Sequence, residues 1–372
     1  MTKLKLLCAG AVLALLPACG GNDDTEAEKA ADAAQAAQEE RRIEVDMAAS
    51  PASVPARTAS VADTLGGFEG EVSGLAFWQH PTVPFMSAIL AANGDAGLFV
   101  VPLSEDGTAS QVEGLFNGGV AVSYLPGGSI AAAYEGGSGD VQIFAISPAD
   151  RTLTLLGAVE AANGAKALCF LGRDLLRIDE SGRQHAIRLT IEDDSVTGTT
   201  APMAGPSAKG CTSTGKAIYV LAENGNVQKA NIGDQTGSAE VPPSNPAAIS
   251  IAALPTTKGP VFLSLLPDGT LQVGRDAIPV TGFADDRAAV LSQAITVGPG
   301  NFGGVYRDGV VGVLTRKNEL KLIPWLGIAN ATDSDASTIS LMPQVTSEDS
   351  QSPQVAVPQI EVPSLPGSSP AE

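Results

Sequence analysis

The sequence is poor in the side chains that commonly carry catalysis. It holds 2 histidines, and aromatic residues make up 4% of its 372 residues. It contains no Gly-x-Ser-x-Gly nucleophile elbow, no glycine-rich phosphate-binding loop and no Cys-x-x-Cys pair. A zinc site built on histidine and a serine–histidine hydrolase are therefore poorly supported.

Positive charge is also scarce, and one long segment has none. The chain has 22 lysines and arginines against 41 acids, which gives a net charge of -19. No lysine or arginine lies between Arg57 and Arg151. Nucleic acids and anionic membrane surfaces bind proteins that present a positive footprint. We therefore expect no nucleic acid partner.

The first hydrophobic run is too short to remain in a membrane as a helix. Lys3 and Lys5 precede an apolar segment over residues 6–16, which ends in Leu-Pro-Ala-Cys. This pattern predicts a signal peptide over residues 1–18. Its ending resembles the bacterial lipobox, which implies a lipid on Cys19 that anchors the protein in a membrane. A cleaved signal that happens to contain a cysteine is the alternative.

The residue after the lipid-modified cysteine bears on the location. Gly20 follows Cys19, and an aspartate there would resemble an inner-membrane retention signal. The sequence thus predicts a secreted bacterial lipoprotein that faces the periplasm or the cell surface, with a preference for the outer membrane.

Two stretches have compositions that do not suit a globular core. Residues 19–57 include an Ala/Glu-rich run of strong helix formers and a polar linker, which predicts a tether, part helical and part flexible. A weak partner helix is an alternative for this run. Residues 333–372 carry proline, serine and acids without a period, which predicts a disordered tail. Residues 58–332 are left for a globular domain.

A repeat of strand, tight polar turn and alternating strand runs through this domain. It occurs in AILAANGDAGLFVVPL, IAAAYEGGSGDVQIFAI, DLLRIDESGRQHAIRL, AIYVLAENGNVQKANI, VFLSLLPDGTLQVG and GVVGVLTRKNELKLIPW. The second strand of each unit begins at Leu98, Val141, Gln184, Val227, Leu271 and Leu320, in steps of 43, 43, 43, 44 and 49 residues. This period in all-β sequence predicts a six-bladed β-propeller with four-stranded blades.

The segment before each hairpin is small and apolar, as strands around a central channel should be. These inner strands are expected in GLAFWQH, VAVSYLP, AKALCFL, AKGCTST, AAISIAALP and QAITVGPG. We also expect a segment within residues 58–71 to pair with the last blade and close the ring.

Two of the four cysteines remain in the folded protein. Cys8 leaves with the signal peptide and Cys19 takes the lipid. Cys169 and Cys211 lie 42 residues apart, which places them on inner strands of neighbouring blades. In an oxidising compartment they could form a disulfide. Two separate buried thiols are the alternative.

The whole domain resembles the β-propeller phytases. The resemblance is carried by GLAFWQHP and AGLFVVPL in the first blade, by AKGCTSTGKAIYVLAENGNVQKANI, and most specifically by the final ELKLIPWLGIA. It implies a six-bladed ring that binds several bridged calcium ions and removes phosphates from inositol hexakisphosphate. Loop carboxylates would hold the calcium, and lysines and arginines would hold a neighbouring phosphate.

Most charged positions of that family's site hold other residues here. The expected acids of the first inner strand correspond to Ser73, Gly74 and Leu75, and the expected bases of the first three blades correspond to residues 93–95, residues 120–124 and Glu180 or its neighbour. The glutamate expected before Gly-Cys is Lys209, and the acids expected after it are residues 212–214. Glu223 and Asp308 match family acids, although Ala222, Val310 and Val311 replace their expected polar neighbours. Glu223 and Asp308 are the candidate calcium ligands, and the catalytic residues stay unknown.

Acids also recur in the turns of successive blades. They are Asp95, Glu135, Asp140, Asp179, Glu180, Glu223 and Asp268. A ring of calcium ligands is one interpretation, but ordinary turn chemistry is favoured, because calcium needs six to eight oxygens in one place. For His80, at the end of an inner strand, a hydrogen-bonded structural role is favoured over a catalytic one.

Two functions follow. The first is a membrane-anchored, calcium-dependent phytase acting on a phosphate ester. The second is a non-catalytic propeller lipoprotein that binds a protein partner in the periplasm or at the cell surface. The fold does not choose between them.

Overall fold

The computed structural model describes residues 58–342 except residues 67, 69, 104–109, 193–194, 233–239, 242–244, 275, 279 and 283–286. The predicted signal peptide, Cys19 and the predicted tether lie outside these residues, as does the tail from residue 343. Within the described part, no helix is long and apolar enough to cross a bilayer.

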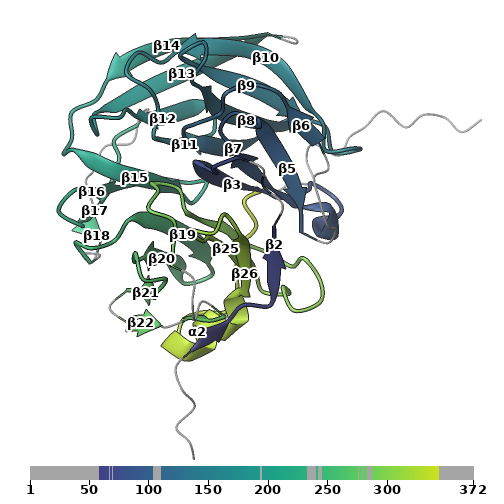
Figure 1. Ribbon diagram of the computed structural model, residues 1–372, viewed down its shortest axis with the longest axis vertical. Helices are drawn as coiled ribbons and strands as arrows, with labels where there is room; N and C mark the ends of the chain where they lie inside the picture. Colours follow the sequence, from purple (N-terminus) through teal and green to yellow (C-terminus); the bar gives the residue numbers. More distant parts are fainter. Residues whose placement is uncertain are drawn as a thin grey trace, which may run out of the picture. The chain divides into compact units, whose positions relative to one another are not determined.

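Six four-stranded antiparallel sheets form the blades of a β-propeller (Figure 1). Blades one to three consist of β3 (Gly74–Trp78), β4 (Ala88–Ala92), β5 (Leu98–Pro102) and β6 (Ser110–Val112); β7 (Val120–Leu125), β8 (Gly128–Glu135), β9 (Asp140–Ile146) and β10 (Leu153–Glu160); and β11 (Ala167–Leu171), β12 (Asp174–Ile178), β13 (Gln184–Glu192) and β14 (Ser195–Pro202). This architecture confirms the predicted fold.

The other three blades follow the same order, with one change in the last. Blades four and five consist of β15 (Ala208–Ser213), β16 (Ile218–Ala222), β17 (Val227–Lys229) and β18 (Glu240–Val241); and β19 (Ser250–Thr256), β20 (Gly259–Leu265), β21 (Leu271–Val273) and β22 (Asp276–Ile278). Blade six consists of β24 (Ile295–Gly298), β25 (Val310–Leu314), β26 (Leu320–Pro324) and β2 (Asp63–Leu65). Its outer strand therefore comes from the beginning of the domain.

The early strands close the ring, as the sequence predicts. Figure 1 shows β2 beside β26, and Asp63 is paired with Leu322 in an antiparallel register. The Tyr306 hydroxyl donates a hydrogen bond to the Asp63 carboxylate, at 2.5 Å. β1 (Ala59–Ser60) adds a second tie by pairing in parallel with β23 (Val280–Thr281). Joining the two ends of the domain in this way makes the six blades one unit.

The innermost strands β3, β7, β11, β15, β19 and β24 define two faces. Each contacts the next around the ring, and β24 contacts β3. Their starting ends lie together, because Gln293, just before β24, bonds to Leu75, Val120 and Leu168. We call the face at which these strands begin the entry face and the face at which they end the exit face. The turns between second and third strands lie on the entry face, and α2 (Trp325–Thr332), which follows β26, lies on the exit face.

The hydrophobic core consists of layers between neighbouring blades. One layer joins blades one and two through Trp78, Leu90, Val100 and Phe144, all of which are almost fully buried. Similar layers separate the other blades. Small residues allow the inner strands to approach: a Cβ on Gly119, before β7, would lie 2.7 Å from Cα of Ala167 at the start of β11. The small, apolar inner segments thus reflect crowding around the channel.

Candidate functional site

The central channel is the first candidate site. Its cavity has a volume of about 350 Å³ and is lined by all six inner strands. The wall is formed by residues 75–77, 120–124, 168–170, 211–213, 251–252 and 295–297, with Gly172, Gly215, Gln293 and Leu341. No lysine, arginine, histidine, aspartate or glutamate occurs among these described lining residues. Neutral hydroxyl, amide and hydrocarbon groups suit an uncharged occupant better than a metal ion or a phosphate.

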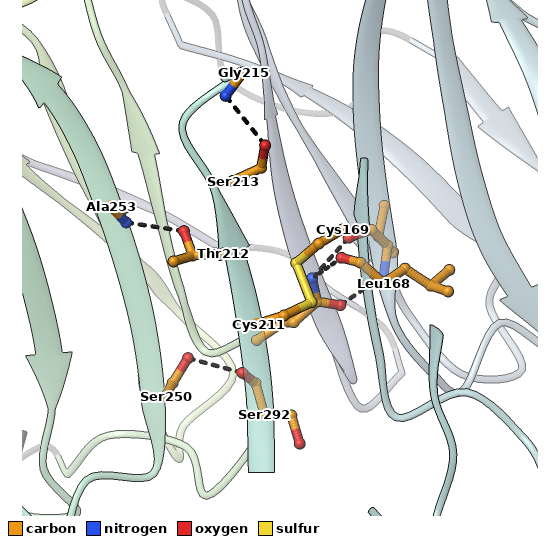
Figure 2. Close-up of a disulfide and its surroundings, with 11 residues drawn as sticks. Leu168, Cys169, Cys211, Thr212, Ser213, Gly215, Ser250, Ala253 and Ser292 are labelled. Carbon is orange, nitrogen blue, oxygen red and sulfur yellow. Dashed lines mark hydrogen bonds between the residues drawn. A yellow bond between two sulfur atoms is a disulfide. The ribbon is translucent and has the colours of Figure 1, made fainter. Parts of the chain in front are cut away.

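A disulfide lies in the channel wall. Figure 2 shows Cys169 on β11 bonded to Cys211 on β15, with the two Cα atoms 6.2 Å apart. Next to it, the Ala253 amide donates to Thr212 Oγ1, which links blades four and five. Both sulfurs are therefore engaged in a covalent tie between blades three and four.

Gln293 spans the entry end of the channel. Its Nε2 donates to the carbonyls of Val120 and Leu168, and its Oε1 accepts from the Val120 amide at 2.8 Å. Its own carbonyl accepts from the Leu75 amide. One buried side chain thus connects blade six with blades two and three. No sequence signal marks this residue, since a glutamine before a strand carries no recognisable pattern.

The segment after α2 crosses the exit end. Thr338 Oγ1 accepts from the Gly300 amide and donates to the Asp308 carbonyl. The Ser340 hydroxyl donates to Oε1 of Gln79 in blade one, and Leu341 lines the channel. The described contacts of the propeller therefore continue past residue 332, where the sequence analysis placed the start of the tail.

His80 supports an apolar loop on the exit face. Its Nδ1 accepts from the amides of Thr82 and Val83, so Nε2 carries the proton and donates to the Pro148 carbonyl at 2.8 Å. Both ring nitrogens are thus used in holding residues 81–86, PTVPFM, in place. The structural role favoured for this histidine is what its contacts show.

Large apolar side chains gather on the exit face. Phe85 and Val305 are both 60% exposed, and they lie in the first loops of blades one and six. Leu326 on α2 and Ile339 in the following segment are 41% and 37% exposed. The segment after α2 bonds to the blade-six loop through Thr338 and to Gln79 in blade one through Ser340. We call the four residues together the exit-face patch. The run PTVPFM between two strands was the available sequence signal for it.

The two candidate calcium ligands do not meet. Glu223 follows β16, a second strand, and therefore lies on the entry face, whereas Asp308 precedes β25 and lies on the exit face. The Glu223 side chain is 53% exposed and lies 3.9 Å from Lys166 Nζ. A single calcium ion cannot bind both, so each acid remains only a predicted ligand on its own face.

Three of the turn acids, Glu135, Asp179 and Asp268, accept hydrogen bonds from nearby backbone amides. Glu135 accepts hydrogen bonds from the amides of Leu115, Gly137 and Ser138. Burial raises the pKa of Glu135, but these bonds outweigh it and leave the pKa below its ordinary value. Asp268 likewise accepts from the Thr270 amide. Within the described ranges no group of three or more His, Cys, Asp or Glu residues could hold a metal ion.

The replaced phytase positions have structural roles of their own. The Ser73 hydroxyl lies 3.2–3.3 Å from the carbonyl oxygens of Ala92, Phe116 and Gly118. A carboxylate there would face three acceptors, whereas a hydroxyl can donate to one of them. Lys209 Nζ donates to the carbonyls of Pro246 and Ala248 and ties blade four to blade five.

Comparison with known proteins adds a likeness of fold. No family model matches the chain, and no curated protein matches its sequence. Among solved structures, it is similar to BBS1N in complex with ARL6DN soaked with mercury, at 12% identity and a TM-score of 0.41 over 64% of this chain and 74% of that chain. For the same complex soaked with lead, the values are 11% and 0.43 over 73% and 97%. These TM-scores indicate nothing further about this chain.

Proposed function

We propose that this chain is a lipid-anchored β-propeller that binds a protein partner through the exit-face patch. The observation that carries this function is the patch itself. Four of the six large, exposed apolar side chains of the described residues belong to it, on two loops, on α2 and on the segment after α2, and specific hydrogen bonds hold the loops and that segment. Exposed apolar clusters on ordered loops commonly mark protein interfaces.

The proposal includes the anchor predicted at Cys19 and a location facing the periplasm or the cell surface. A lipid on Cys19 would hold the protein at a membrane. The partner would be a membrane-associated or periplasmic protein with an apolar surface. Hydrolysis of inositol hexakisphosphate is not part of the proposal, because Glu223 and Asp308 lie on opposite faces.

Site-specific photo-cross-linking tests this function. A benzophenone amino acid is placed at Phe85 or at Val305 in the full chain, expressed in its own cell envelope. The matched control is Val290, which is 59% exposed but lies between blade five and β24 on the entry face. We expect the same discrete cross-linked product from both exit-face positions and none from the control.

A surface substitution distinguishes a specific interface from non-specific hydrophobic binding. Leu326→Asp should remove the product formed at Phe85, because a carboxylate in the centre of an apolar interface loses its hydration on binding. Leu155→Asp, at a residue 54% exposed on the outer strand β10, should leave it intact. Products that form equally at Val290, or that persist in Leu326→Asp, would contradict the proposal.

A further inference from the structure

A buried arginine in blade three lacks a bound carboxylate. Arg177, on β12, is 2% exposed, and its Nη1 donates to the carbonyls of Ala162 at 2.8 Å and Gly164 at 2.9 Å. Its Nε is buried and has no hydrogen-bond partner among the described residues. Two neutral carbonyls leave the guanidinium charge without a bonded counter-ion. Buried charges in proteins are normally paired, so this arrangement indicates a missing anion.

The nearby carboxylate of Asp179 is already fully used. Its Oδ1 accepts from the amides of Ser181 and Arg183 and from the Ser181 hydroxyl, and its Oδ2 accepts from His185 Nε2 at 3.2 Å. Burial lowers the pKa of Arg177, and the charge of Asp179 opposes this shift without a hydrogen bond between the two. Asp179 therefore orients His185 instead of binding Arg177.

Arg177 and His185 line the same groove. The two residues are directly opposite each other on β12 and β13. The groove has a volume of about 600 Å³ and lies between the outer strands of blades two and three. Its walls are residues 158–160, 162–163, Arg177, His185, Thr197, Gly198 and Thr200. Since Asp179 holds Nε2 of His185, Nδ1 is the ring nitrogen left for a ligand, and it donates to a carboxylate only when the ring is doubly protonated.

We propose that this groove binds a small carboxylate. The edge of a guanidinium formed by Nε and Nη2 can donate two parallel hydrogen bonds to one carboxylate. In Arg177 this edge lies opposite Nη1, which donates to the two backbone carbonyls. Because Nε is buried, the ligand must enter between β10 and β14 to reach it. The hydroxyl of Thr200, on the same face of the sheet as His185, supplies a further donor. Glu160, which also lines the groove, disfavours ligands with more than one negative charge.

This site goes beyond the partner-binding function, because the groove and the exit-face patch are formed by different parts of the ring. The probe is acetate, added to the full chain in solution, with acetamide as a neutral molecule of the same shape. The readout is the ¹⁵N–¹H resonance of Arg177 Nε and the ring resonances of His185. Acetate should shift both to saturation, and acetamide should shift neither. Equal shifts with the two molecules, or no saturable shift with acetate, would overturn the proposal.

Inorganic phosphate serves as a third probe of the ligand class. It should bind at least about tenfold more weakly than acetate, because Glu160 opposes a dianion. Saturation by phosphate with no response to acetate would show that the assigned class is wrong.

Variants separate binding from stability. Arg177→Lys keeps the charge but loses the bidentate edge, so acetate affinity should fall at least about tenfold. Because Arg177 also ties blades two and three, His185→Gln is tested beside it and should weaken acetate by about threefold. Arg188→Lys, exposed on the same strand and paired with Asp174 at 2.9 Å, is the matched control. Unchanged affinity in a folded Arg177→Lys protein, or an equal loss in the control, would refute the site.

Discussion

The two faces of the propeller come from one repeat but use their loops differently. On the entry face, turn acids such as Glu135, Asp179 and Asp268 accept hydrogen bonds from backbone amides, and Glu135 does so from three. On the exit face, polar residues such as His80 and Thr338 hold the loops from within, and apolar side chains such as Phe85 stay exposed. Polar groups of the entry face such as Glu135 therefore stabilise the fold, whereas apolar surface stays exposed on the exit face.

Both faces depend on the same ring of blades. The Cys169–Cys211 disulfide is a covalent bond between two of these blades. Replacing Cys169 and Cys211 by alanine should lower the free energy of unfolding by about 4 kcal/mol, because the bond closes a loop of 42 residues. Urea unfolding of the full chain measures the loss. Wild-type protein in a reductant is the control and should lose a similar amount. An unchanged urea midpoint in the double variant would contradict a structural role for this bond.

Gln293 tests how far the entry end depends on one side chain. Gln293→Ala leaves the amide of Val120 and the carbonyls of Val120 and Leu168 without partners, so unfolding should become easier by about 2–3 kcal/mol. The control is Gln111→Ala, an exposed glutamine that donates to the Ala96 carbonyl, which should cost at most about 0.5 kcal/mol. Urea unfolding measures the loss of free energy of unfolding in each variant. Equal losses would contradict the role of Gln293 in linking blades.

The period of the sequence was sufficient to predict the architecture. Five third strands begin at the predicted residue, and β9 begins one residue early, at Asp140. The ring closure was also predictable, because a propeller whose last blade lacks its outer strand must take that strand from the other end of the domain. The repeat is formed by strands and turns that are close together in the sequence, so the number of blades and their strands could be predicted from the sequence alone.

The candidate site was less predictable, for two physical reasons. Matching Glu223 and Asp308 to family positions ignored strand direction: Glu223 comes after a second strand and Asp308 before one, which places them on opposite faces. Contacts such as those of Thr338 and Gln293 join residues far apart in the sequence. A serine- and threonine-rich segment has the same composition whether it is free in solution or bonded across a channel, so composition predicted disorder for residues 333–342.

Glu135 tests the claim that entry-face acids serve their turns. Glu135→Gln replaces one acceptor oxygen by an amide donor that faces the Ser138 amide, which should cost about 1–2 kcal/mol at neutral pH. The folded-state pKa of Glu135 lies below its ordinary value, so its contribution is present above the unfolded pKa and is lost as pH falls through the folded pKa. The stability difference between wild type and variant should therefore shrink below about pH 4.

Urea unfolding of both proteins from about pH 7 to about pH 3 measures this difference, because a glutamate carboxylate becomes protonated within this range. The control is Glu113→Gln, at an exposed glutamate of the same loop region. A difference that grows on acidification would mean that the protonated form of Glu135 is the one the turn prefers. The turn acids would then need another explanation.

The smallest expected effect concerns calcium. Glu223 and Asp308 each offer a single carboxylate on different faces, and a calcium ion needs about six to eight oxygens from one locality. Calcium should therefore leave the melting temperature of wild type, Glu223→Gln and Asp308→Asn unchanged, and the full chain should release no phosphate from inositol hexakisphosphate. A bound ion at about 100 times its Kd would add about 2.7 kcal/mol, which a melting scan resolves easily. If calcium stabilised the protein and only Asp308→Asn removed this effect, a calcium site would lie on the exit face. The contrast between polar entry-face turns and an apolar exit face would then be wrong.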